Sequence, residues 1–228
     1  MSSTKKEKQS NERTAQRVLL WTCIIVVLGG IVWAAVSSTK KSGESSEKRS
    51  IDTSRVDEKD WMKGNRDAKL TLVEYSDFQC PACAAYHPVV RKVAYEMGGR
   101  VKIVYRHYPL KSTHKNAESA SRAAEAAGVQ GKFWEMHDML FEKQSEWSPL
   151  GDPKPTFDEY AKSLQLNVEK FSQDMASSQV QAKIDSDVKS ADKASVNATP
   201  TFFLNGKKLD QPQGYDGLKN SINEASGE

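Results

Sequence analysis

Two cysteines three positions apart, Cys80 and Cys83, are the residues of this sequence best suited to chemistry. They follow an apolar run at 70–75 and lead straight into a helix-like stretch that ends at Met97. At the start of a helix, unpaired backbone N–H groups and the positive end of the helix dipole favour a thiolate over a thiol. Because the thiolate is the attacking species in disulfide exchange, this placement predicts a redox-active pair.

Two other interpretations of the motif compete with redox chemistry. Half a zinc site would need two further ligands at metal spacing, and the only other cysteine is Cys23, in a very different stretch. A purely structural disulfide closing so short a loop would constrain the unfolded chain little. The four histidines show no ligand spacing: His87, His107, His114 and His137.

The charge of the chain is unevenly distributed. The formal net charge is +3 over 228 residues, but residues 1–56 carry a balance of +5 and residues 57–228 a balance of −2. A near-neutral domain gives no electrostatic argument for nucleic-acid binding. The length fits one globular domain with appendages.

A stretch of nineteen residues without charge, 18–36, follows the polar and basic segment 1–17. That length approaches the roughly 20 residues that cross a bilayer as a helix, and Trp21 and Trp33 lie near its ends as interfacial aromatics do. The basic flank predicts a single-pass protein of the cytoplasmic membrane, with the N-terminus inside and the rest outside. Disulfides persist on that outer side.

A cleaved signal peptide is the alternative to this transmembrane anchor. Its apolar region is usually shorter, and Ala35-Val36-Ser37 is a mediocre cleavage site, so the uncleaved anchor is favoured. Residues 37–56 are rich in Ser, Lys, Glu and Gly and predict a flexible tether. The catalytic domain is then expected at 57–228.

The order of elements in that domain predicts an α/β fold. The chain reads β-α-β, then a helical block at about 111–195, then β-β-α, which is the order of a thioredoxin fold with a helical insertion, here preceded by one transmembrane helix. The separation of the first two strands requires a parallel crossover. The predicted elements are strands at 70–75, 101–106, 199–204 and 207–209, a hairpin turn at Asn205-Gly206, and helices up to Met97 and at 214–225.

Four segments of the sequence resemble the DsbA-like thiol–disulfide oxidoreductases, and the N-terminal span resembles the membrane-tethered branch of that family. The match covers residues 60–225 in the family's order. The four segments are 74–83, 106–110, 131–137 and 196–206.

The resemblance implies a role for each matching residue. Cys80 is the nucleophile and Cys83 the resolving thiol. Pro200 matches the family's cis-proline beside the disulfide, and Thr199 would offer its backbone to an extended substrate chain; an ordinary trans proline at a strand start is the alternative. Glu74 matches a buried acid that relays a proton to Cys83, unless it reaches solvent or pairs with a lysine.

Two residues depart from the strongly oxidising members of the family: Ala82 replaces a histidine and Thr199 a frequent valine. The direction of electron flow therefore stays open. The favoured function is an oxidase that passes its disulfide to exported, thiol-bearing proteins and is reoxidised by a quinone-linked membrane partner, with no cofactor or metal. A tethered reductase or isomerase is the alternative, and a non-catalytic peptide-binding chaperone module is a third.

Overall fold

The computed structural model describes residues 55–227. The predicted basic segment 1–17, the predicted anchor 18–36 and most of the predicted tether lie outside these residues and stay predictions. Among residues 55–227, no helix is both long and apolar enough to span a membrane.

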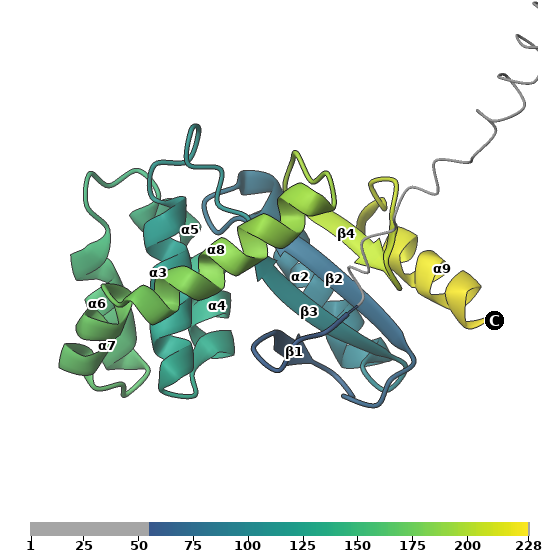
Figure 1. Ribbon diagram of the computed structural model, residues 1–228, viewed down its shortest axis with the longest axis horizontal. Helices are drawn as coiled ribbons and strands as arrows, with labels where there is room; N and C mark the ends of the chain where they lie inside the picture. Colours follow the sequence, from purple (N-terminus) through teal and green to yellow (C-terminus); the bar gives the residue numbers. More distant parts are fainter. Residues whose placement is uncertain (1–54, 228) are drawn as a thin grey trace, which may run out of the picture. The chain divides into compact units, whose positions relative to one another are not determined.

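A mixed five-stranded sheet forms the centre of the domain (Figure 1). Its order is β1-β3-β2-β4-β5, with β2 parallel to β3 and the other pairs antiparallel. This confirms the thioredoxin fold and the parallel crossover predicted from the sequence. The strands are β1 (Trp61–Lys63), β2 (Leu70–Ser76), β3 (Val101–His107), β4 (Thr201–Leu204) and β5 (Lys207–Lys208).

Side chains of β2 alternate between two buried faces of the sheet. Leu70 and Leu72 pack with residues of α2 (Pro81–Met97) and α9 (Gly214–Ser226), whereas Val73 and Tyr75 pack with residues of α8 (Ser178–Lys193) on the other face. The same alternation places Glu74 and Ser76 on the face beneath α2. The strand is buried along its whole length, so both of these polar side chains lie inside the protein.

The predicted helical insertion is present between β3 and β4, and α8 runs from it back to the sheet (Figure 1). Its apolar core contains alanines of α3 and aromatic side chains of α4 and α6, together with Cys80 and Cys83. The two cysteines therefore lie where the insertion meets the sheet domain. The helices are α3 (Ala117–Val129), α4 (Phe133–Glu142), α5 (Gln144–Trp147), α6 (Lys154–Ser163) and α7 (Val168–Met175).

Local sequence explains several of these element boundaries. Asn167 and Ser177 cap α7 and α8 by accepting hydrogen bonds from backbone N–H groups three residues on. Asn205 and Gly206 both have positive φ, as a two-residue hairpin of this type requires. The predicted turn between β4 and β5 is thus confirmed.

Strand β1, which adds an antiparallel edge to β3, is not among the elements predicted from the sequence. Three residues are too few to show a strand period, so no pattern could reveal it. The Trp61 ring stacks on Phe133 with centroids 4.4 Å apart, and its Nε1 donates to Glu125 Oε1 at 2.7 Å. Contacts with the helical insertion therefore hold this strand in place.

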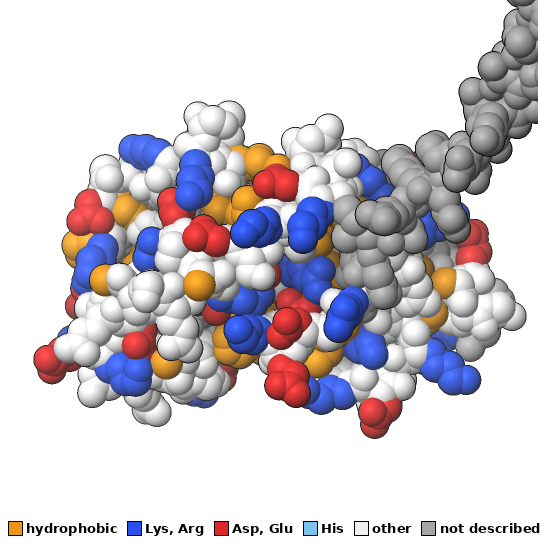
Figure 2. Space-filling model, in the orientation of Figure 1, with side chains coloured by type: hydrophobic (Ala, Val, Ile, Leu, Met, Phe, Trp, Pro, Cys, Tyr) orange, Lys and Arg blue, Asp and Glu red, His pale blue; other side chains and the backbone are white. Residues whose placement is uncertain are grey.

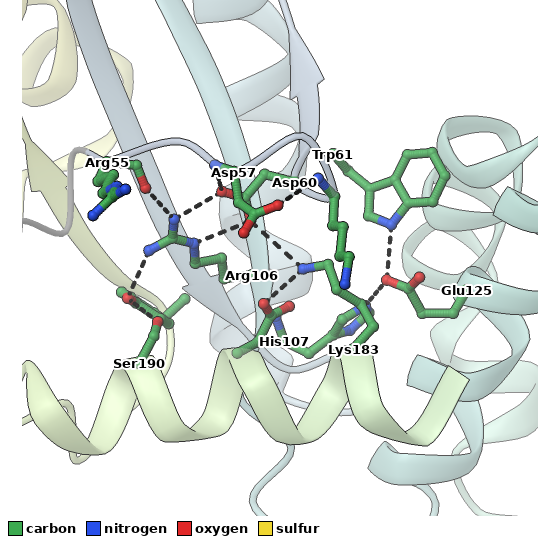
Figure 3. Close-up of polar contacts among 12 residues, drawn as sticks. Arg55, Asp57, Asp60, Trp61, Arg106, His107, Glu125, Lys183 and Ser190 are labelled. Carbon is green, nitrogen blue, oxygen red and sulfur yellow. Dashed lines mark hydrogen bonds and ion pairs between the residues drawn. The ribbon is translucent and has the colours of Figure 1, made fainter. Parts of the chain in front are cut away.

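A buried group of charges joins the sheet to α8 (Figure 3). Arg106 of β3 donates to Asp60 Oδ2 at 2.8 Å, and Lys183 Nζ lies 2.6 Å from Asp187 Oδ1 and 3.5 Å from Asp60 Oδ1. Asp187 Oδ2 also accepts the His107 backbone N–H at 3.0 Å. These ion pairs fix how the insertion is oriented on the sheet.

On the outer face shown in Figure 2, basic and acidic side chains lie interspersed.

Candidate active site

Cys80 and Cys83 occupy the first turn of α2, as the spacing predicted. Cys80 is the N-cap residue and Pro81 takes the first helical position, where a missing N–H removes no helical hydrogen bond. Both cysteines are thiols in this structure. Cys80 keeps 7% of its surface exposed and Cys83 none, so only Cys80 can be reached from outside.

The surroundings of Cys80 favour its ionised form. A hydrogen bond from the Cys83 thiol, opposed by burial and helped by Thr199 and by the backbone N–H groups of Ala82 and Cys83, lowers the pKa of Cys80 to about 5. In the thiol form, Cys80 Sγ donates to the Thr199 carbonyl at 3.4 Å, and the buried Thr199 hydroxyl has no partner. That hydroxyl is free to turn toward the sulfur when Cys80 ionises.

Cys83 and Glu74 have the opposite character. Burial, the hydrogen bond to Cys80 and the charges of Cys80 and Glu74 raise the pKa of Cys83 well above its usual range. Glu74 is 4% exposed, and burial raises its pKa to about 7. A carboxyl group that titrates near neutral pH beside a thiol that must gain and lose a proton can serve as a proton donor and acceptor.

Ser76 is a further residue of the site and is not among those predicted from the sequence. Its side chain has no exposed surface, and its hydroxyl has no hydrogen-bond partner. As a donor to the charged forms of Glu74 and Cys83, it opposes part of the rise that burial causes in both pKa values. It therefore lies within reach of the two groups that exchange the proton. Its place two residues after Glu74, on the same face of β2, is the only sequence signal that could have indicated it.

Side chains of the helical insertion hold the loop before Cys80 in place. Gln144 of α5 donates from Nε2 to the carbonyls of Phe78 and Cys80 at 2.7 and 3.0 Å. The fully buried Asp77 carboxylate accepts from His114 Nδ1 at 2.7 Å and from the Gln79 N–H at 2.7 Å. The contacts of Gln144 and His114 link residues far apart in sequence, so no local pattern could predict them.

Pro200 and Thr199 lie on the loop before β4, beside Cys80. The Thr199–Pro200 peptide bond is cis, as the resemblance implied. A hollow of about 240 Å³ adjoins Pro200 and continues along β4 and the residues after β5. The five residues singled out from the sequence, Glu74, Cys80, Cys83, Thr199 and Pro200, therefore lie around one centre.

One group of potential metal ligands exists within the described residues, although the sequence spacing gave no sign of it. Ligand atoms of His87, His137 and Asp138 all lie within 4.8 Å of one another. Both histidines contact Asp138 Oδ1, at 3.0 and 2.8 Å, and Lys63 Nζ lies 3.3 Å from the same atom. The ammonium group brings positive charge to the carboxylate that a cation would need, so we interpret the group as an ion-pair cluster.

Comparisons with known proteins agree with this geometry. A family model described as thioredoxin matches residues 56–224. The chain is 39% identical over 165 residues to the Na(+)/H(+) antiporter NhaA 3 of Salinispora tropica, a match that covers 72% of this chain and 24% of that protein. The chain thus spans about a quarter of the length of the curated relatives it matches.

Solved structures with the same fold include DsbA-family oxidoreductases. Oxidised BdbD from Bacillus subtilis superposes with a TM-score of 0.66 at 24% identity, covering 73% of this chain and 92% of that one. Wolbachia pipientis alpha-DsbA1 gives 0.69 at 21% identity, with 78% and 96% covered. At these identities the likeness shows a shared thioredoxin fold.

The difference between the two thiols can be measured directly. In the reduced protein, the ultraviolet absorbance of the Cys80 thiolate should rise with a midpoint near pH 5. This transition should be absent in Cys80→Ser. Cys83→Ala should raise that midpoint, because the neutral thiol that donates to the Cys80 thiolate is lost. A midpoint near the ordinary thiol value of 9.0 in the unaltered protein would contradict the geometry.

Proposed function

The chain belongs to the thioredoxin family, and on that premise we propose that it is a thiol–disulfide oxidoreductase that acts mainly as an oxidase of exported proteins. The observation that supports this proposal is the unequal pair of thiols. Cys80 is acidic and reachable, whereas Cys83 is buried and hard to ionise. In such a pair, Cys80 can exchange with substrates and Cys83 can resolve the mixed disulfide between Cys80 and a substrate.

In the oxidase direction the reaction takes two exchange steps. A substrate thiolate attacks Cys80 Sγ of the disulfide form, the Cys80–Cys83 bond breaks, and Cys83 leaves as a thiolate that takes a proton from the Glu74 carboxyl group. A second substrate thiol, after losing its proton to solvent, attacks the substrate sulfur of the mixed disulfide and releases Cys80 as a thiolate. Two electrons thus pass from the substrate thiols to the cysteine pair.

The substrate is proposed to bind as an extended chain beside Pro200. The Thr199 carbonyl already faces Cys80 Sγ, so a strand-like segment pairing with this backbone would bring its own thiol to the nucleophile. The hollow beside Pro200 is lined by Phe202 and Leu209 among others and offers apolar surface to such a segment. Unfolded, thiol-bearing proteins fit this mode better than compact ones.

The direction of electron flow is proposed from the acidity of Cys80. The pKa of Cys80 is lower in the folded protein than in the unfolded chain, so its ionisation stabilises the reduced, folded protein. This contribution is fully present above the pKa of the unfolded state and is lost as the pH falls through the pKa of the folded state, about 5. At neutral pH it therefore stabilises the reduced protein, while the disulfide form has no thiolate to stabilise. A reduced form that is favoured in this way makes the disulfide an oxidant.

We propose that residues 18–36 anchor the domain to the outer side of the cytoplasmic membrane, with residues 37–56 as a tether. The uncharged length of this stretch and its basic flank support the anchor and its orientation. Regeneration of the disulfide needs an oxidant, for which a quinone-linked membrane reoxidase is proposed. Ion antiport is not proposed, because the chain spans about a quarter of the antiporters it resembles.

Trapping of substrates tests the function. In cells, Cys83→Ser should accumulate mixed disulfides between Cys80 and exported proteins, because Cys83 is no longer present to attack Cys80 Sγ and free a substrate that has not found its second thiol. The matched variant Cys80→Ser, which keeps the buried thiol and loses the reachable one, should accumulate few. Equal trapping by both variants, or by neither, would refute the assigned roles. A chaperone that needs no exchange would keep its activity after loss of both cysteines.

Membrane anchoring is tested by fractionation of the full-length chain. The protein should sediment with membranes and resist carbonate extraction, and protease added from outside should cut within 37–56. Recovery of a soluble, shortened chain beginning near Ser37 would instead identify the segment as a cleaved signal peptide.

A further inference from the structure

A cavity of about 20 Å³ lies between Glu74 and the His87–His137–Asp138 cluster, space for about one water molecule. Glu74, His87 and His137 all line it, as does Tyr105, whose buried hydroxyl has no hydrogen-bond partner. A void this small holds a water when two to four polar groups face it, and these side chains supply them.

The cluster on the far side of the cavity reaches solvent. The side chains of Lys63 and Asp138 are 25% and 28% exposed, whereas those of His87 and His137 are 6% and 7% exposed. Asp138 therefore joins two buried imidazoles to the surface through hydrogen bonds at 2.8 and 3.0 Å.

Glu74 is 4% exposed and lies on a strand that is buried along its whole length, and the cavity adjoins its side chain. Any proton taken from Cys83 must leave through a neighbouring group. The titratable and charged groups that face Glu74 or the cavity are Lys63 of β1, Cys83, His87 and Arg91 of α2, Tyr105 of β3, and His137 of α4, with Asp138 behind them.

We propose that the cavity holds a water that passes protons between Glu74 and the Lys63–Asp138–His87–His137 cluster, which makes Lys63 and Asp138 positioning residues for exchange at Cys83. The proposal rests on the oxidoreductase function proposed above and assigns the route by which its proton reaches solvent. The uncharged Tyr105 hydroxyl and the imidazoles offer sites that can both accept and donate a hydrogen bond.

The proton balance can be followed in the step that releases a thiol from a mixed disulfide at Cys80. Cys83 gives its proton to the Glu74 carboxylate, and the Cys83 thiolate attacks Cys80 Sγ. The new Cys80–Cys83 bond forms as the bond to the leaving thiolate breaks, and that thiolate takes a proton from solvent. Glu74 then passes its proton through the cavity water to the cluster. The reverse reaction uses the same path in the opposite direction.

Filling the cavity tests the path. Val90 lines it and neighbouring Val89 does not, so Val90→Ile and Val89→Ile form a matched pair on α2 that each add one methyl group. In the full-length chain, release of a peptide thiol from a preformed mixed disulfide should slow about tenfold in Val90→Ile. It should stay unchanged in Val89→Ile, and the titration of the Cys80 thiolate should be unaffected in both.

Removing the charges of Lys63 and Asp138 tests their role in proton exchange at Glu74. Release requires Glu74 as a base, so its rate should rise with pH through a midpoint near 7. Lys63→Met removes a positive charge that favours the carboxylate and should move this midpoint up by about half a unit. Asp138→Asn leaves Lys63 uncompensated and should move it down. The exposed pair on α7 supplies controls, since Lys170→Met and Asp174→Asn should not move it.

A loss of packing alone would lower stability without moving the midpoint in opposite directions. An unchanged release rate in Val90→Ile, or midpoints that coincide in Lys63→Met and the unaltered protein, would overturn the proposal. If Asp138→Asn does not fold, the results for Val90→Ile and Lys63→Met still decide whether the proposal holds. Failure of the unaltered protein to release any thiol would instead count against the proposed function itself.

Discussion

The hydrogen bond from the Cys83 thiol to the Cys80 sulfur is the interaction on which the rest of the site depends. It is the largest factor that lowers the pKa of Cys80, and it is also one of the factors that raise the pKa of Cys83. This one contact therefore makes Cys80 the ionised nucleophile and keeps Cys83 protonated, although both residues are cysteines. The first turn of α2 sets their spacing, and complete burial of Cys83 keeps the proton on the inner sulfur.

The rest of the fold keeps this turn in place and supplies its proton. Gln144 of the insertion fixes the carbonyls of the loop that enters α2. Lys183 and the buried Asp187 of α8 fix the insertion on the sheet, by an ion pair to Asp60 and a hydrogen bond from the His107 backbone. Breaking a buried pair of this kind typically costs about 3–5 kcal/mol, so the orientation is strongly held. β2 contributes differently, because its alternation places Glu74 beneath the helix that carries Cys83.

The features that could be predicted from the sequence are those with a local signal. Asn205-Gly206 predicted the hairpin, the spacing of the first two strands predicted a parallel crossover, and the Cys motif indicated the start of α2. The features that could not be predicted depend on contacts between distant segments. β1 has three residues and no period, yet it supplies Lys63. His87 and His137 lie fifty residues apart and meet only because α2 packs on α4.

The reduction potential of the Cys80–Cys83 pair, measured by equilibration with glutathione, tests the oxidase assignment most directly. A thiolate with a pKa of about 5 stabilises the reduced form, while the Ala82 side chain adds no hydrogen-bond donor to that of its backbone, which predicts an oxidant weaker than the strongest of its kind. The expected potential is about −100 to −190 mV, between that of DsbA and that of protein disulfide isomerase or near either. A potential at or below about −250 mV, in the range of thioredoxin, would contradict the oxidase assignment and favour a tethered reductase.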